Sequence, residues 1–131
     1  MSTPVGPYTP IVRAGSWLIC SGQLGLASEA DGGPPALVSG GPGPQLTQAV
    51  ANAAALLDGA GASLADVVKT TVFAVDPADF PVVNEAYVAA FGDHRPARSM
   101  VAVSGLPMGA AVEIEVWAQL GPTGGGPTSS E

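Results

Sequence analysis

The stretch from residue 95 to residue 120, RPARSMVAVSGLPMGAAVEIEVWAQL, constrains the fold of this chain more than any other segment. Apolar residues alternate with other residues over positions 99–104 and again over 111–118, on either side of the segment Gly-Leu-Pro-Met-Gly. Period-two alternation on both sides of a short Gly/Pro segment is typical of a β-hairpin. We therefore expect two antiparallel strands here.

The hydrophobic pattern also predicts the register of this hairpin. Val101 should face Ile114, because a slip of one residue would place valines opposite glutamates. One face of the pair then carries Val101, Val103, Val112, Ile114 and Val116. The other face carries Arg98, Met100, Ala102, Glu113, Glu115 and Trp117. A cation, two carboxylates and an indole on one strand face indicate a site or a subunit interface.

The rest of the chain predicts an α+β fold. Strands are expected over residues 11–13, 17–24 and 67–75, and amphipathic helices over 45–60 and from about 76 to 91. The Gly/Pro-rich segment 25–44 is predicted to be a loop. Both helices should cover one face of a mixed sheet, and the semi-apolar second face should be covered by oligomerisation.

Composition limits the class of protein. The chain has 131 residues, 47% of them hydrophobic, which fits one domain over residues 1–120 followed by a disordered tail, 121–131. Four basic residues against eleven acidic ones, a net charge of −7, disfavour a nucleic-acid partner. We expect a cytoplasmic protein that does not associate with a membrane, because no apolar run reaches spanning length and no signal pattern is present.

Single residues exclude several kinds of site. One histidine and one cysteine are too few for a His-rich or thiolate metal site within one chain. Cys20 is predicted to be a packed strand residue, and His94 a solvated loop residue. Arg98 could bind a carboxylate through its planar fork. For Glu113, pairing with arginines across an interface and catalysis remain open alternatives.

Several short motifs occur in order over residues 6–118, and together they resemble the RidA family, also called the YjgF or UK114 family. The matching pieces are Gly6-Pro7-Tyr8, Ser21-Gly22-Gln23, residues 45–52, residues 67–73, Asp79-Phe80, Val83-Asn84, Pro96-Ala97-Arg98-Ser99, Leu106-Pro107 and Val112-Glu113-Ile114-Glu115. Met100 stands where many members have Cys or Thr, and the 25–44 loop is atypical.

The resemblance implies a chorismate-mutase-like fold, a homotrimer and clefts between subunits. It also implies hydrolysis of 2-aminoacrylate-type enamines and imines to 2-oxo acids and ammonia, without a metal or organic cofactor. By position, Arg98 would bind the substrate carboxylate and Glu113 would position or activate water. The cleft would be lined by Tyr8, Ser21, Gly22, Asn84 and the backbone of Met100.

Two rival functions are a non-catalytic trimeric small-carboxylate-binding or chaperone-like protein and an endoribonuclease, against which the acidic charge argues. The deaminase hypothesis meets one geometric difficulty. In the expected hairpin Arg98 lies opposite Trp117 and Glu113 opposite Ala102, roughly 13 Å apart along the strands. Either a bulge with long side chains or a second subunit must then complete the site.

Overall fold

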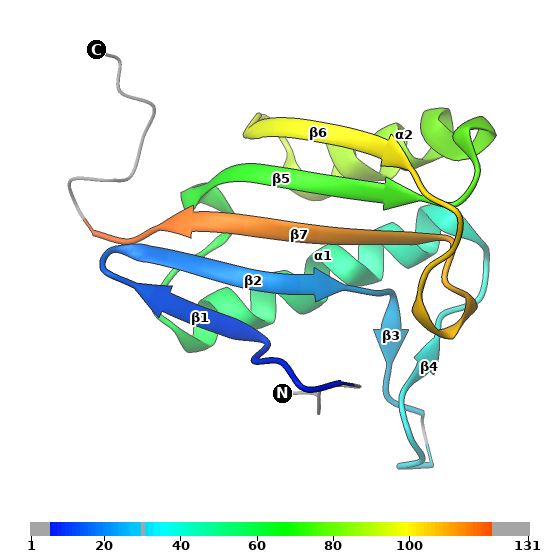
Figure 1. Ribbon diagram of the computed structural model, residues 1–131, viewed down its shortest axis with the longest axis horizontal. Coiled ribbons are helices and arrows are strands. Elements are labelled where there is room, and N and C mark those ends of the chain that lie inside the picture. The colour runs from blue at the N-terminus through cyan, green and yellow to red at the C-terminus, as the bar shows by residue number, and fades with distance from the viewer. Residues whose placement is uncertain (1–5, 30, 122–131) are drawn as a thin grey trace.

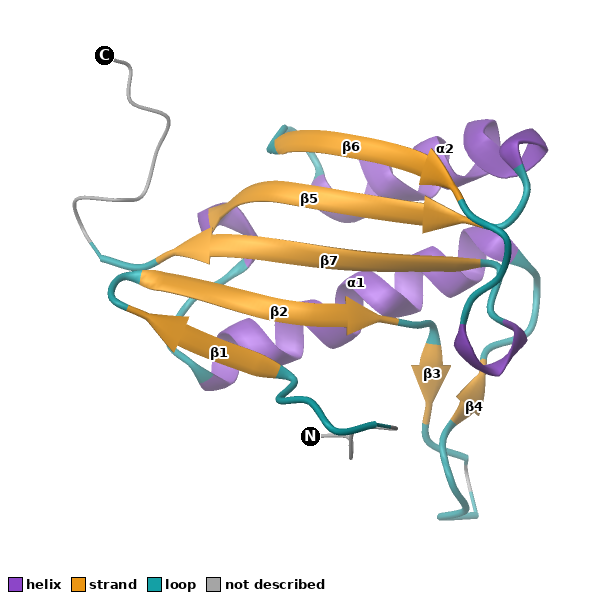
Figure 2. Ribbon diagram, in the orientation of Figure 1, coloured by secondary structure: helices purple, strands orange, loops and turns teal. Residues whose placement is uncertain are grey.

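The computed structural model of the protein describes residues 6–29 and 31–121. Its main sheet has five strands, and two helices cover one face of it (Figures 1 and 2). The strands lie in the spatial order β1 (Ile11–Ala14), β2 (Trp17–Gln23), β7 (Val112–Gln119), β5 (Val67–Ala74) and β6 (Ala97–Ala102). The helices are α1 (Pro42–Gly59) and α2 (Phe80–Phe91). The predicted α+β class, with both helices on one face, is confirmed; nearly all of the predicted disordered tail lies outside the described residues.

The core lies between the sheet and the two helices. Along β7, the fully buried Val112, Ile114 and Val116 alternate with the half-buried Glu113 and Glu115. From the helix side, α1 contributes a stripe at three- and four-residue spacing, in which Leu46, Ala49, Val50, Ala53 and Leu57 are buried. Truncating one of the larger of these side chains to alanine typically costs about 2–5 kcal/mol.

The predicted hairpin between residues 99–104 and 111–118 is wrong. Strand β6 pairs in parallel with β5, with Val101 beside Phe73, whereas β7 is antiparallel to both β2 and β5 and places Ile114 beside Val72. The physical reason is the helix α2, which connects β5 to β6 and so makes a parallel crossover. The chain then passes through a 3-10 turn, η3 (Pro107–Gly109), before β7 runs back between β2 and β5.

The segment predicted as a loop over residues 25–44 contains two short paired strands, β3 (Leu26–Ala27) and β4 (Ala36–Leu37). Two further 3-10 turns are η1 (Leu64–Asp66) and η2 (Pro77–Asp79). Asp76 caps η2 by accepting a hydrogen bond from the Ala78 amide, whereas Asp79, which precedes α2, makes no side-chain cap bond.

The face of the sheet opposite the helices is uncovered within the described residues, and it is partly apolar. Trp17 and Trp117 meet there edge to face, with ring centroids 6.0 Å apart. Val12, Val101 and Trp117 are each more than two-fifths exposed. This arrangement confirms the predicted semi-apolar second face, while the homotrimer stays a prediction.

Two further expectations can be compared with the structure. Cys20 is 1% exposed inside β2, and burial raises the pKa of its thiol to about 11, so its prediction as a packed strand residue is confirmed. His94 is not a solvated loop residue: its Nε2 lies 2.7 Å from the Val67 carbonyl oxygen and its ring packs near Phe91. Neither helix α1 nor α2, nor any other helix among the described residues, has the length and hydropathy to cross a membrane.

Candidate active site

A small pocket opens where the end of β2, the start of β7 and the segment before β1 meet. Its volume is about 250 Å³. Four of the seven predicted site residues line it, namely Tyr8, Ser21, Gly22 and Glu113. Two residues that were not predicted for the site, Leu24 and Pro107, complete the lining. The structure therefore brings the predicted water-activating carboxylate together with most of the predicted lining residues.

A β-bulge in β2 shapes the floor of this pocket. Cys20 pairs with Val116 and Gln23 pairs with Ile114, so β2 has two residues between these pairs where β7 has one. The two β2 residues are Ser21 and Gly22, and both line the pocket. Bulges of this kind bend a strand locally and re-aim its side chains, and they are common beside active sites.

The segment before β1 is tied to this bulge by two hydrogen bonds. The Ser21 hydroxyl donates to the Thr9 carbonyl at 2.6 Å, and the Ser21 amide donates to the Pro10 carbonyl at 2.8 Å. These bonds hold the neighbouring Tyr8 at the mouth of the pocket, where its side chain is 43% exposed. Ser21 thus has a structural partner as well as a place in the pocket wall.

The Glu113 carboxyl is half-buried and lies directly over Gly22. A Cβ atom at position 22 would lie 2.6 Å from the Glu113 Cδ, so only glycine leaves room for the carboxyl in this position. Burial raises the pKa of Glu113 above its ordinary value, and the neighbouring Glu115 raises it further. A carboxylate with a raised pKa is a better proton acceptor than an ordinary surface glutamate.

A second polar cluster forms around Arg98, away from this pocket. The Arg98 Nη1 donates to the Asn84 Oδ1 on α2 at 2.7 Å. The guanidinium also lies over the ring of Tyr87, 4.9 Å from its centroid, which is a cation–π arrangement. The Tyr87 hydroxyl in turn shares a buried hydrogen bond of 2.8 Å with the Thr70 Oγ1. Asn84, which the resemblance placed in the lining of the cleft, therefore orients Arg98.

The expectation that Arg98 and Glu113 share one face of the sheet is wrong. Arg98 pairs with Thr70, which is fully buried beneath the helices, whereas Glu113 pairs with Phe73 and points to the uncovered face. Their Cα atoms are separated by two strand spacings and by three residues along the strands, which is roughly 14 Å. One chain therefore holds the two key side chains on opposite faces of its sheet.

The position of Met100 is explained by the same register. Its side chain is half-buried on the helix-covered face and packs against the core, one alternation along β6 from Arg98. Met100 thus lies with the Arg98 cluster and outside the pocket of Glu113. The role expected for its backbone in holding a substrate stays a prediction.

Sequence reasoning missed several residues that shape the two clusters. Tyr87 was not among the predicted site residues, although its spacing of three from Asn84 places both residues on one helix face. Leu24 and Pro107 were counted as strand and turn residues. No three His, Cys, Asp or Glu side chains within residues 6–29 and 31–121 gather where they could hold a metal ion.

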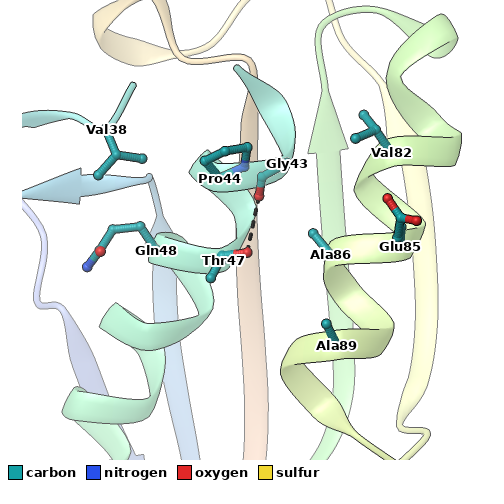
Figure 3. Close-up of a pocket in the computed structure, with 9 residues that line it drawn as sticks. All are labelled: Val38, Gly43, Pro44, Thr47, Gln48, Val82, Glu85, Ala86 and Ala89. Atoms are coloured by element: carbon teal, nitrogen blue, oxygen red, sulfur yellow. Dashed lines mark hydrogen bonds between the residues drawn. The ribbon is translucent and has the colours of Figure 1, made fainter. Parts of the chain in front are cut away.

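A larger hollow of about 610 Å³ lies between α1 and α2 (Figure 3). Its walls are mostly apolar or small side chains, including Val38, Pro44, Val82, Ala86 and Ala89. None of the predicted site residues lines it. The predicted site residues are therefore divided between the pocket of Glu113 and the Arg98 cluster.

Comparison with known proteins places these clusters in a family. The family model described as Endoribonuclease L-PSP matches residues 1–120. The human 2-iminobutanoate/2-iminopropanoate deaminase is 40% identical over 118 residues, which cover 90% of this chain and 83% of that protein. This chain belongs to the RidA family. A RutC family protein of Pyrococcus horikoshii is likewise 40% identical, over 86% of each chain.

Solved structures of the family share the fold. RidA from an Antarctic Psychrobacter species superposes with a TM-score of 0.81 at 38% identity and covers 92% of that chain and 90% of this one. The yjgF gene product of E. coli gives a TM-score of 0.76 at 39% identity, with 88% of this chain and 90% of that chain covered. The predicted family and the predicted fold are both confirmed.

Proposed function

We propose that this protein hydrolyses reactive enamines and imines of the 2-aminoacrylate type to 2-oxo acids and ammonia, in clefts that two copies of the chain complete together. The observation that carries the shared cleft is the placement of Arg98 and Glu113 on opposite faces of one sheet, each within its own cluster. The reaction is supported by relatives about 40% identical that are named 2-iminobutanoate/2-iminopropanoate deaminases.

At one side of the cleft, Arg98 binds the substrate carboxylate. The bond to Asn84 uses one guanidinium nitrogen, and the ring of Tyr87 supports the guanidinium from one side. The remaining N–H groups are left to form two parallel, charge-assisted hydrogen bonds with a carboxylate. This fixes the orientation of the C2 carbon, which is the atom that water must attack.

At the other side, Glu113 of a neighbouring copy acts on water. The enamine first takes up a proton from solvent at C3 and becomes the iminium ion. Glu113 then removes a proton from water as the oxygen bonds to C2, and the C=N double bond becomes a C–N single bond. Glu113 returns this proton to the nitrogen. The C–N bond then breaks as the C2 hydroxyl gives its proton to Glu113 and the C=O bond forms, so that ammonia leaves and Glu113 releases the last proton to solvent. The raised pKa of Glu113 suits both the uptake and the return of this proton.

The uncovered sheet face supports assembly of the copies. It presents a tryptophan pair and exposed valines beside Lys69, whose Nζ donates to the Ser99 Oγ at 2.8 Å. A face of this kind is normally buried against another subunit. We propose a cyclic trimer, in which each interface joins the Arg98 cluster of one copy to the Glu113 pocket of the next.

An endoribonuclease activity has weaker support, although the matching family model is described as one. RNA binding depends on neutralising phosphates with lysine and arginine. This chain has four such residues and a net charge of −7. All four lie in the described residues, and they are spread over β1 (Arg13), β5 (Lys69), the loop after α2 (Arg95) and β6 (Arg98).

The direct test is an assay on the full-length protein with freshly generated 2-aminoacrylate. Release of ammonia and of the 2-oxo acid should exceed the spontaneous rate, and the Glu113→Gln variant should lose most of that excess while remaining folded. If the wild type adds nothing to the spontaneous rate but binds a small 2-oxo acid in calorimetry, the protein is a binder and the deaminase proposal fails. Cleavage of single-stranded RNA, measured in parallel, would instead support the ribonuclease.

A further inference from the structure

Three side-chain amides on one side of α1 tie the helix to the backbone around the pocket of Glu113, two of them directly and the third through its neighbour on the helix. They belong to Gln45, Gln48 and Asn52. Gln45 and Asn52 are two helical turns apart, so they project from the same face of α1. The mechanism proposed above does not use any of them.

Gln45 holds the wall that carries Glu113. Its Oε1 accepts a hydrogen bond of 2.9 Å from the Ala111 amide, and the Gln45 side chain is only 8% exposed. The Ala111 carbonyl accepts a second bond, from the Val75 amide at 3.1 Å. Ala111 lies immediately before β7 and two residues before Glu113, so these bonds fix where the strand bearing the carboxyl begins.

Asn52 holds the opposite wall. Its Nδ2 donates to the carbonyl oxygens of both Leu24 and Leu26, at 3.0 and 2.9 Å. The Gln48 Nε2 donates to the Asn52 Oδ1 at 2.9 Å, which orients the amide so that its nitrogen faces these carbonyls. Leu24 lines the pocket and follows the bulge at Gly22.

The chain passes very close to α1 at Gly25, between the two residues whose carbonyl groups Asn52 binds. A Cβ at Gly25 would lie 2.6 Å from the Gln45 Cα, so glycine at position 25 permits this approach. One rigid helix therefore binds the β2 side of the pocket through Asn52 and the β7 side through Gln45. Apolar side chains at these positions could pack the helix, but they could not bind either backbone segment.

We infer that Gln45 and Asn52 are positioning residues, which set the spacing between the two walls of the pocket and thereby hold the Glu113 carboxyl over Gly22. This inference rests on the proposed function, because it assigns the two amides a role in the turnover that Glu113 carries out. Arg98 lies on the other face of the sheet, so loosening the two walls should affect the chemical step more than carboxylate binding.

The test compares three variants of the full chain. Gln45→Met keeps the length of the side chain but removes the acceptor. Gln45→Glu keeps an acceptor oxygen, and a negative charge is favourable in the first turns of a helix. Ala55→Gly is the matched control, because Ala55 is exposed on α1 and its methyl side chain cannot hydrogen-bond to either wall, while glycine weakens the helix.

Gln45→Met should lower kcat by about tenfold to a hundredfold, because small displacements of catalytic groups have effects of this size, while KM changes little. Gln45→Glu should restore kcat to near the wild-type value, and Ala55→Gly should lower only the melting temperature. The inference is overturned if Gln45→Met keeps the wild-type kcat, or if Ala55→Gly with an equal loss of melting temperature loses as much kcat.

Amide hydrogen exchange over residues 111–113 separates this inference from the proposed function. Faster exchange there in Gln45→Met, but not in Ala55→Gly, is expected whether or not the protein is a deaminase. A wild type without deaminase activity would refute the proposed function. Unchanged exchange in an active Gln45→Met protein would refute the positioning role alone.

Discussion

The Glu113 carboxyl lies against the Cα of Gly22, in space that any other residue at position 22 would fill. The contact joins two strands that the sequence separates by about ninety residues, and it depends on the bulge in β2. Two residues that the resemblance assigned to the site therefore form one unit, in which the absence of a side chain at Gly22 leaves space for the Glu113 carboxyl.

Gly22→Ala should move the carboxyl and leave the fold intact. The added methyl group meets the far end of a flexible side chain, which can rotate away at little cost. We expect kcat to fall by about tenfold or more with a nearly unchanged melting temperature. Steady-state kinetics with thermal melts would decide this, and wild-type turnover in Gly22→Ala would show that the position of the carboxyl over Gly22 is irrelevant.

The raised pKa of Glu113 predicts a pH dependence of stability. The ordinary pKa of 4.5 is the value in the unfolded chain, and burial raises it in the folded state. Between the two values the folded protein binds more protons, so wild-type stability falls as pH rises through this window. Glu113→Gln cannot ionise, so its melting temperature relative to wild type should be higher at pH 7 than at pH 4. An equal difference at both pH values would contradict the assignment.

Substitutions of Arg98 test carboxylate binding. Loss of a two-point, charge-assisted contact in a partly desolvated cleft costs about 2–5 kcal/mol, so Arg98→Ala should lower kcat/KM by roughly thirtyfold to several thousandfold. Arg98→Lys should recover little, because a point charge cannot reproduce the planar fork. If Lys restores most of the activity while Ala first lowers stability and oligomer content, Arg98 is structural.

The uncovered face predicts which apolar residues matter for assembly. Trp117 is 41% exposed on this face, whereas Val88 is 48% exposed on α2, on the helix side. Trp117→Glu should dissociate the protein at micromolar concentration, and Val88→Glu should leave its mass three times that of one chain. Light scattering measures both. A wild-type monomer would remove the shared cleft altogether.

The sequence predicted the elements well because each depends on local pattern. Burial alternates along β7 as its valines indicated, and α1 follows its apolar stripe to within three residues at the start. The pairing of the strands was harder, because it depends on long-range packing. Residues 97–102 are mostly exposed at the edge of the sheet, so their alternation carries little information about which strand lies beside them.

The same error placed Arg98 on the wrong face. The predicted hairpin placed Arg98 on the same face of the sheet as Glu113. The strand–helix–strand order of β5, α2 and β6 already indicated a parallel crossover instead. The bulge at Ser21 and Gly22 has no sequence signal apart from the glycine itself. The resemblance to a family identified most of the site residues, but only the structure shows that they form two clusters on opposite faces.

Subunit complementation tests the shared cleft most directly. Arg98→Ala and Glu113→Gln should each be nearly inactive alone. If each site takes Arg98 from one copy and Glu113 from another, refolding the two variants together in equal amounts should restore about one quarter of wild-type activity. With random assembly, about half of the sites receive an intact Arg98, and about half of those also receive an intact Glu113. A mixture that stays as inactive as its components, although mass measurements show mixed oligomers, would contradict the account.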